Sequence, residues 1–335
     1  TYIGKGVNVF TASLSNAICG EDSKLTSENF DEIFHAFEKC LEAVQANLTT
    51  VLPQSLRRLF RWKTSRQREF IAAAKTVRNF AREVIESRER KLAREMQDAP
   101  TDLLAYILDI AKNEPNFTME EKIDEVVTFF VAAHDTTAGS LAFTLFEILR
   151  NEKIYQRILQ EIDIVVGEKT FITDKDLNKL HFLHYCMKES LRLYPVVGGP
   201  DRILMKDLVV QGYYLPSGCS VFLEKYVAHR NPKYWNNPQT FNPDRFNTRQ
   251  SKTITPGVYF PFSLGPRNCI GKVFAEVQIK LLLVRLFQTF RLELVPGQSE
   301  RIKERLTLRP RDGVVCTVKR RQFPKAKLTR SMTRT

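Results

Sequence analysis

The stretch that most constrains this chain is FSLGPRNCIG, residues 262 to 271, where one cysteine lies between two glycines just before an apolar helix. A cysteine in a long chain is most often a small buried hydrophobic residue. Here Gly265 and Gly271 permit tight backbone paths and the close approach of a flat group. The helix is expected to begin near Ile270, and the N–H groups at its start favour a negative charge. The sulfur of Cys269 is therefore placed to act as a thiolate.

A thiolate in this position needs a cation. No second cysteine or histidine lies close by in the sequence. A metal bound to Cys269 must therefore bring its other ligands, and iron in haem does so while leaving one axial position for the protein. Arg267, two residues before the cysteine, is then placed to pair with a haem propionate.

Cysteine spacing and charge distribution narrow the alternatives. The 6 cysteines lie far apart without a C-x-x-C pair, which argues against a zinc site or a dense disulfide framework and favours a reducing compartment. The formal charge of +13 comes from two segments. Residues 57–78 hold eight Lys and Arg against Glu69 alone, and residues 319–334 hold seven with no acidic residue. No zinc-finger spacing or RNA-binding signature accompanies them, so we expect no nucleic-acid partner.

Apolar periodicity predicts helices over most of the first half of the chain. The expected helices cover residues 28–47, 65–96, 101–112, 119–150, 151–166, 180–193 and 270–290. The one after Thr118 has a capping-box spacing to Glu121 and is apolar nearly all round from Val126 to Phe146, so it should be buried in a core.

The second half of the chain favours short strands. DLVVQGYYLPSGCSVFLEKY reads as a hairpin broken at Gly212, and FRLELV and LTLRPRDGVVCTVK supply further strands, the last pair turning at Asp312-Gly313. The expected fold class is mainly α with small antiparallel β-sheets (α+β). Residues 1–320 are expected to form a single domain, and residues 321–335 a basic tail that is predicted to be disordered.

Two features bear on membranes and on the chain ends. No run of 18 or more apolar residues is present, so no span is predicted. LTTVLPQSLRRLFRWK, residues 48–63, mixes apolar and basic side chains as the edge of an anionic membrane would require, with an ordinary solvated loop as the alternative. The chain begins at Thr1 in what reads as the middle of a helical region, so we expect a fragment.

The pattern F-x-x-G-x-R-x-C-x-G is complete here as Phe262, Gly265, Arg267, Cys269 and Gly271. It resembles the haem-binding loop of the cytochrome P-450 family. Three further stretches match that family in the expected order.

The first is ESLR, in which Glu189 and Arg192 lie on one helix face, and the second is FNPDRF, which supplies Arg245. The resemblance implies a structural ion-pair set. The third is AAHDTTAGS in the apolar helix, with Asp135 and Thr136 in an otherwise apolar wall.

The resemblance implies a P-450-like fold that lacks its N-terminal portion, with Cys269 as the axial thiolate to the haem iron. It implies that Asp135 and Thr136 steer water and deliver protons during oxygen activation. The alternative is a threonine bonded to its own i−4 carbonyl and an aspartate at a local kink. Arg202 matches a second propionate-binding arginine. Ala133 departs from the family's frequent glycine, which we expect to tune the site.

Among family members the motifs look most like the cholesterol 24-hydroxylase group, with fatty-acid hydroxylases as rivals. The implied function is a monooxygenase that hydroxylates an apolar, sterol-like substrate with O₂ and NADPH-derived electrons from a flavoprotein reductase. The expected location is the cytosolic face of the endoplasmic reticulum membrane. Substrate contacts are expected at Ala132, Ala133, Val196 and Val197 and near Asp312.

Two other functions stay open. A haem-thiolate isomerase or dehydratase would need no reductase, but its relatives usually lose the acid–alcohol pair that Asp135 and Thr136 form here. A truncated, haem-free product would act as a binding or dimerising partner only.

Overall fold

The computed structural model describes residues 30–48, 65–94, 102–304 and 306–321. Its longer helices are α2 (Phe30–Leu48), α4 (Ser65–Arg94), α5 (Leu103–Asn113), α6 (Met119–Arg150), α7 (Glu152–Val165), α9 (His181–Leu193) and α11 (Lys272–Thr289). Short helical turns are α8 (Asp174–Lys179), α10 (Lys225–Ala228), η3 (Pro243–Phe246) and η4 (Gln250–Thr253). The strands are β1 (Asp201–Ile203), β2 (Leu208–Val210), β3 (Tyr213–Leu215), β4 (Ser220–Phe222), β5 (Phe290–Leu294), β6 (Ile302–Glu304), β7 (Leu308–Pro310) and β8 (Cys316–Arg320).

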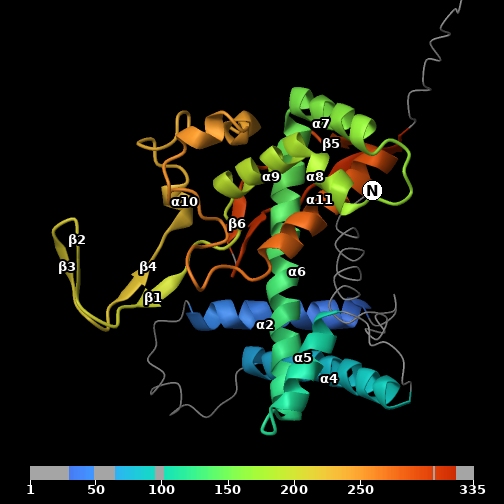
Figure 1. The fold of residues 1–335 in the computed structure, drawn as a ribbon, viewed down its shortest axis with the longest axis vertical. Helices are drawn as coiled ribbons and strands as arrows, with labels where there is room; N and C mark the ends of the chain where they lie inside the picture. Colours follow the sequence, from blue (N-terminus) through green and yellow to red (C-terminus); the bar gives the residue numbers. More distant parts are fainter. Residues whose placement is uncertain (1–29, 49–64, 95–101, 305, 322–335) are drawn as a thin grey trace, which may run out of the picture.

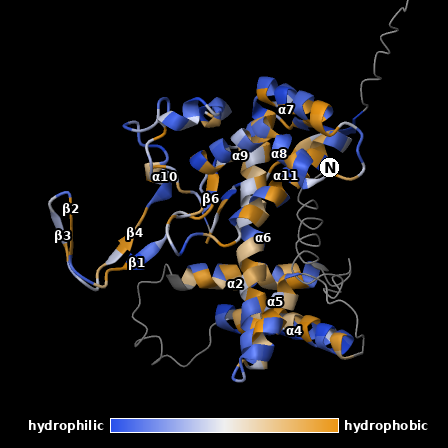
Figure 2. Cartoon of the chain, viewed as in Figure 1, coloured by the Kyte–Doolittle hydropathy of each residue, from blue (hydrophilic) through white to orange (hydrophobic). Residues whose placement is uncertain are grey.

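Helix α6 is the axis of the molecule (Figure 1). Its predicted capping box is confirmed, because the Thr118 hydroxyl accepts from the Glu121 N–H at 3.2 Å while the Glu121 carboxylate accepts from the Thr118 N–H at 2.7 Å. This arrangement satisfies two of the backbone donors that a helix N-terminus leaves unpaired. The long apolar run that follows carries the helix through both cores of the protein (Figure 2).

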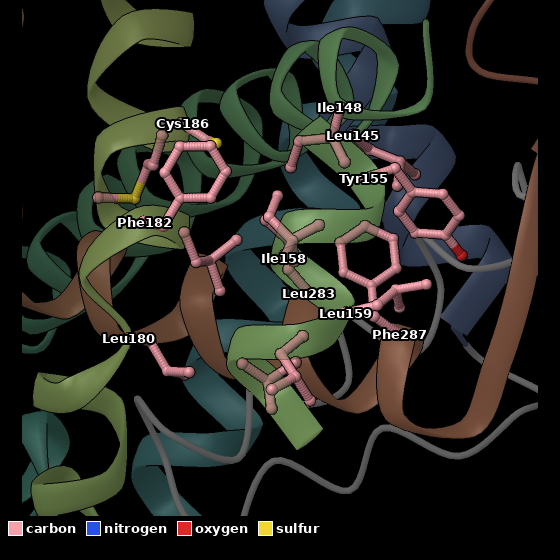
Figure 3. Packing of buried hydrophobic residues seen from close by; sticks show 14 of the residues in the cluster. Leu145, Ile148, Tyr155, Ile158, Leu159, Leu180, Phe182, Cys186, Leu283 and Phe287 are labelled. Carbon is pink, nitrogen blue, oxygen red and sulfur yellow. The ribbon is translucent and has the colours of Figure 1, made fainter. Parts of the chain in front are cut away.

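Two hydrophobic cores lie along α6. The first half of α6 packs with α2, α4 and α5 through buried side chains that include Ile123, Val126 and Phe130. The second half packs with α7, α9 and α11, where Tyr155 and Phe287 lie with ring centroids 5.2 Å apart (Figure 3). The middle of α6 therefore passes between the cores.

Among the described residues, α6 is the one helix long and apolar enough to span a membrane by length and composition. The sequence analysis predicted no membrane span because it looked for an uninterrupted apolar run, so it did not identify α6. Its packing in both cores accounts for the same composition, because a helix that is apolar all round is buried in a protein core as readily as in a bilayer.

The strands of the described chain form four two-stranded antiparallel sheets, β1-β4, β2-β3, β5-β8 and β6-β7. The predicted hairpin is confirmed for β2-β3, where Gln211 and Gly212 take φ values of 49° and 85° between the paired Val210 and Tyr213. This sheet, with β1 and β4, extends away from the helices as an arm (Figure 1).

The predicted pairing across Asp312-Gly313 is wrong. A turn does form there, with φ 71° at Gly313, but β7 pairs with β6 and β8 pairs with β5. The reason is tertiary. Gln298 donates to and accepts from the Val315 backbone at 2.7 Å in each direction, and this holds the start of β8 beside the end of β5.

The predicted fold class is confirmed, and the longer helices lie within a few residues of their expected bounds. The sequence analysis missed the short elements α8, α10, η3, η4, β1 and β6, which are too brief to show a period. The membrane-edge prediction for residues 48–63 and the tail prediction for residues 321–335 lie outside the described residues except at their first residues, Leu48 and Arg321.

Candidate functional site

Cys269 lies in an exposed loop that ends where α11 begins. Its N–H donates to the Phe262 carbonyl at 2.9 Å, and the Asn268 N–H donates to the Gly265 carbonyl at 3.1 Å, so the loop closes on itself. Gly265 has φ 78°, in the left-handed region that favours glycine. Gly271 precedes the first residue of α11, and a Cβ added there would lie 3.9 Å from the Cys269 sulfur. The thiol is thus exposed at the N-terminus of an 18-residue helix, where a negative charge is stabilised.

The middle of α6 is more accessible than its C-terminal half. Ala132 is exposed, and Ala133 and Thr136 are half-buried. The Thr136 hydroxyl donates to the Ala132 carbonyl at 2.8 Å. This is the ordinary i−4 bond of a helical threonine, and it leaves the hydroxyl oxygen able to accept a further hydrogen bond.

Asp135 is buried on the other side of the helix. Its carboxylate accepts from the Thr307 hydroxyl and forms an ion pair with Arg309. Arg309 also donates to the carboxylate of Glu38 at 2.8 Å, so one guanidinium joins α2, α6 and β7. The acid and the alcohol are sequence neighbours, yet they face different surroundings.

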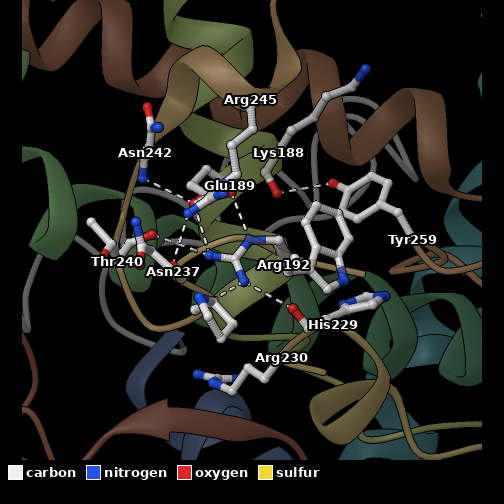
Figure 4. A network of polar contacts seen from close by, with 12 residues as sticks. Lys188, Glu189, Arg192, His229, Arg230, Asn237, Thr240, Asn242, Arg245 and Tyr259 are labelled. Atoms are coloured by element: carbon white, nitrogen blue, oxygen red, sulfur yellow. Dashed lines mark hydrogen bonds and ion pairs between the residues drawn. The ribbon is translucent and has the colours of Figure 1, made fainter. Parts of the chain in front are cut away.

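The three residues of the predicted ion-pair set lie together in one buried network (Figure 4). Arg192 donates to both oxygens of Glu189 at 2.8 Å, and both side chains are 0% exposed. The same guanidinium donates to the carbonyls of His229 at 2.8 Å, Pro238 at 2.7 Å and Thr240 at 3.2 Å. A buried guanidinium is tolerated when its donors are satisfied in this way.

Arg245 completes the network from η3. Its guanidinium donates to Glu189 at 3.2 Å and to the Asn237 carbonyl at 2.8 Å, and the Asn242 N–H donates to Glu189 at 2.9 Å (Figure 4). Glu189 therefore joins α9 to the long connection between α10 and the cysteine loop.

His229 links this network to the cysteine loop. Its carbonyl accepts from Arg192, and its Nε2 accepts from the Phe260 N–H at 3.0 Å. The Phe260 carbonyl in turn accepts from the Ser263 N–H at 2.9 Å. Burial lowers the pKa of His229 to about 3, so the ring is neutral at pH 7 and its Nε2 is available as an acceptor.

The two arginines predicted for propionates are both exposed. Arg267 lies in the cysteine loop, and Arg202 lies in β1 opposite Val221, where it donates to the Asp201 carbonyl at 2.8 Å. They come from separate elements of the fold.

The predicted substrate residues divide by exposure. Val196 is buried against Gly139 of α6, where an added Cβ would lie 3.1 Å from the Val196 side chain and 2.9 Å from the Leu308 carbonyl oxygen. Val197 is 41% exposed. Asp312 is exposed, outside the strands β7 and β8.

The residues present fit a haem. The donor is a single exposed thiol, and no group of three or more His, Cys, Asp or Glu side chains suited to a bare ion occurs among the described residues. Exposed apolar side chains flank the thiol and the β1 arginine, namely Leu264, Ile270, Phe274, Val197 and Ile203. An apolar plane that carries carboxylates matches this combination of apolar side chains, thiol and exposed guanidiniums.

Thr307 and Arg309, the partners of Asp135, were missed by the sequence reading. Their alternation in LTLRP indicates one face of a strand, but no local signal says which acid that face meets. Lys225, which the structure buries behind the cysteine loop, was missed as well.

Comparison with known proteins finds a family model that covers all the residues that the structure describes. The family model described as Cytochrome P-450 matches residues 5–322. Cytochrome P-450 3A6 of Oryctolagus cuniculus is 31% identical over 226 residues, which is 66% of this chain and 45% of the relative. Cytochrome P-450 3A7 of Homo sapiens is 35% identical over 202 residues, 59% of this chain and 40% of the relative. Cytochrome P-450 4c3 of Drosophila melanogaster is 33% identical over 214 residues, 63% of this chain and 40% of the relative.

Solved structures share the fold. The heme domain of cytochrome P-450DA aligns with a TM-score of 0.78 and 25% identity, over 94% of this chain and 68% of that one. Retinoic acid-bound cyanobacterial CYP120A1 aligns with a TM-score of 0.81 over 95% of this chain and 69% of that one, and at 24% identity it shows the fold alone. The chain spans less than half the length of the three curated relatives above.

Proposed function

This chain belongs to the cytochrome P-450 family, and on that premise we propose that it is the catalytic part of a haem-thiolate monooxygenase acting on an apolar substrate. The observation that carries the proposal is the exposed Cys269 thiol at the start of α11, in a loop closed by its own backbone hydrogen bonds. Haem, the family's cofactor, supplies the oxygen-activating chemistry when bound.

Several of the chain's own residues hold the cofactor in this proposal. Cys269 would hold the iron through its sulfur, and a thiolate there would supply electron density to the metal. Gly265 and Gly271 would let a flat group approach the loop, and the Phe262 carbonyl accepts from the N–H of Cys269. Arg267 and Arg202 pair with the propionates from two different elements.

Thr136 and Asp135 have separate roles in proton handling. Thr136 lies on the accessible side of α6, where its hydroxyl proton is held in the bond to the Ala132 carbonyl and its Oγ1 lone pairs can accept from and orient a water molecule. Asp135 pairs with Arg309 and accepts from the Thr307 hydroxyl on the buried side. In this proposal these contacts hold its carboxylate in place beside Thr136.

The substrate class follows the accessible surface near α6. Ala132, Ala133 and Val197 are apolar and at least partly exposed, which suits a lipid-like substrate. In this proposal the electrons come from a flavoprotein reductase. The relatives compared above carry 3A and 4 names and give no support to the narrower cholesterol 24-hydroxylase assignment, so a sterol remains a prediction beside a fatty acid. The proposed location is the cytosolic face of the endoplasmic reticulum membrane. We place residues 1–320 in one catalytic domain.

The absorption spectrum of the reduced protein with carbon monoxide tests the proposal. The wild-type chain should show the red-shifted Soret band of a thiolate-ligated haem, and Cys269→Ser should lose it. Cys219→Ser is the matched control, because Cys219 is a half-buried free cysteine on the β4 side of the arm. A wild-type chain that binds no haem would overturn the proposal in favour of a haem-free binding partner.

A second experiment tests proton handling. Thr136→Ala should retain haem but divert reducing equivalents into peroxide. Thr144→Ala is its control, since Thr144 forms the same i−4 bond to the Ser140 carbonyl at 2.7 Å in the buried part of α6. Equal coupling efficiency in the two variants would remove the role given to Thr136.

A further inference from the structure

Lys225 is a lysine in an unusual place. It lies in α10, is only 4% exposed, and its Nζ donates to the Pro261 carbonyl at 3.0 Å. Lysine is almost never fully buried unless it is paired. Among the described residues, none of the ion pairs found includes Lys225, and the one acceptor of its Nζ is the carbonyl of the residue directly before the cysteine loop.

Burial lowers the pKa of Lys225, while the charges of Cys269 and then Glu224 raise it. Glu224 is exposed, and its carboxylate already accepts from the Tyr226 N–H at 3.0 Å. The Pro261 carbonyl is therefore the group that the observed contacts place against this ammonium group.

The side chain of His229, which directly follows α10, contacts Phe260, the residue before Pro261. His229 follows Lys225 by four residues, so the two side chains lie on one face. Lys225 binds the Pro261 carbonyl, and His229 binds the Phe260 N–H. Because the His229 carbonyl accepts from Arg192, the loop is connected through this segment to the buried ion-pair network.

We propose that Lys225 is a positioning residue of the cysteine site. Its ammonium group fixes the Pro261 carbonyl and so the start of the loop that carries Cys269. This anchoring role concerns the chain itself and can be tested without the cofactor.

Hydrogen exchange of the haem-free chain tests this anchoring role. Lys225→Met, which keeps an apolar stem and removes the donor, should speed exchange of the Ser263 and Cys269 amides at least about tenfold. Lys225→Arg keeps the charge and a donor and should retain most of the protection. Lys280→Met is the control, because Lys280 is also buried and donates to a carbonyl. Its acceptor is Leu177, at 3.3 Å, in the core that α7, α9 and α11 share. Unchanged loop protection in Lys225→Met overturns this role, even where the proposed function holds.

Discussion

The Glu189 network and the cysteine loop are joined through His229 but differ sharply in what satisfies their side chains. In the network, buried charges meet protein groups at nearly every donor and acceptor, and Glu189 and Arg192 are fully buried (Figure 4). In the loop the backbone is held by the protein, while the thiol of Cys269 and the guanidinium of Arg267 are exposed. The network therefore contributes to folding, and the loop presents its side chains for binding.

This comparison predicts its largest effect at Glu189. Glu189→Ala leaves the guanidiniums of Arg192 and Arg245 without their carboxylate, which should lower the free energy of unfolding by about 3–5 kcal/mol. Urea unfolding of the haem-free chain measures it. The control is Glu152→Ala, which breaks an exposed pair with Arg291 at 3.1 Å and should cost under about 1 kcal/mol. Equal effects would contradict the contrast between network and surface.

The next effect is a pH dependence at His229, the link between the two regions. Its pKa is lowered from 6.5 to about 3 by burial, so below pH 6.5 the unfolded chain takes up a proton that the folded chain does not. The contribution of His229 to the free energy of unfolding is therefore fully present above pH 6.5. It falls as the pH drops towards 3, by up to about 2 kcal/mol from pH 6.5 to pH 5.

Unfolding free energies at pH 7 and pH 5 check this dependence. His229→Gln should reduce the pH dependence without abolishing it, because burial also lowers the pKa of His134 and His184 to about 4. His181→Gln, at an exposed position, should leave the profile as in the wild type. A profile that His229→Gln does not change would show that the ring is protonated inside the fold.

A smaller effect is expected for the backbone of the loop. Gly265→Ala meets no neighbouring atom but must keep φ near 78°, which should cost about 1 kcal/mol. Gly271→Ala is the matched control, because its φ of −83° suits any residue and its Cβ would lie 3.9 Å from the Cys269 sulfur. Urea unfolding that ranks the two variants in the opposite order would refute the conformational argument.

The smallest effect on stability is expected at the residue that matters most for function. Cys269→Ser changes an exposed side chain, so the unfolding free energy of the haem-free chain should move by less than about 0.5 kcal/mol. The same substitution should abolish the thiolate spectrum. A large loss of stability would mean that the sulfur contributes to folding, and the contrast between the two regions would disappear.

Much of the fold prediction rested on patterns within a few residues of one another. The capping box at Thr118, the apolar run of α6 and the i,i+3 spacing of Glu189 and Arg192 are all contained within one helix. The turn at Asp312-Gly313 was also local and does form, but the strand pairing inferred from it was wrong because pairing depends on partners distant in the sequence.

The sequence by itself determined the helices, the closed cysteine loop and the residue types of the site, because these depend on contacts within a few residues of each other. The tertiary structure decided that Arg309 meets Asp135, that Arg245 joins Glu189 from 56 residues away, and that Lys225 is buried behind the loop. Such contacts form only when two cores pack around one helix, and no local pattern records which distant surface a polar side chain will face.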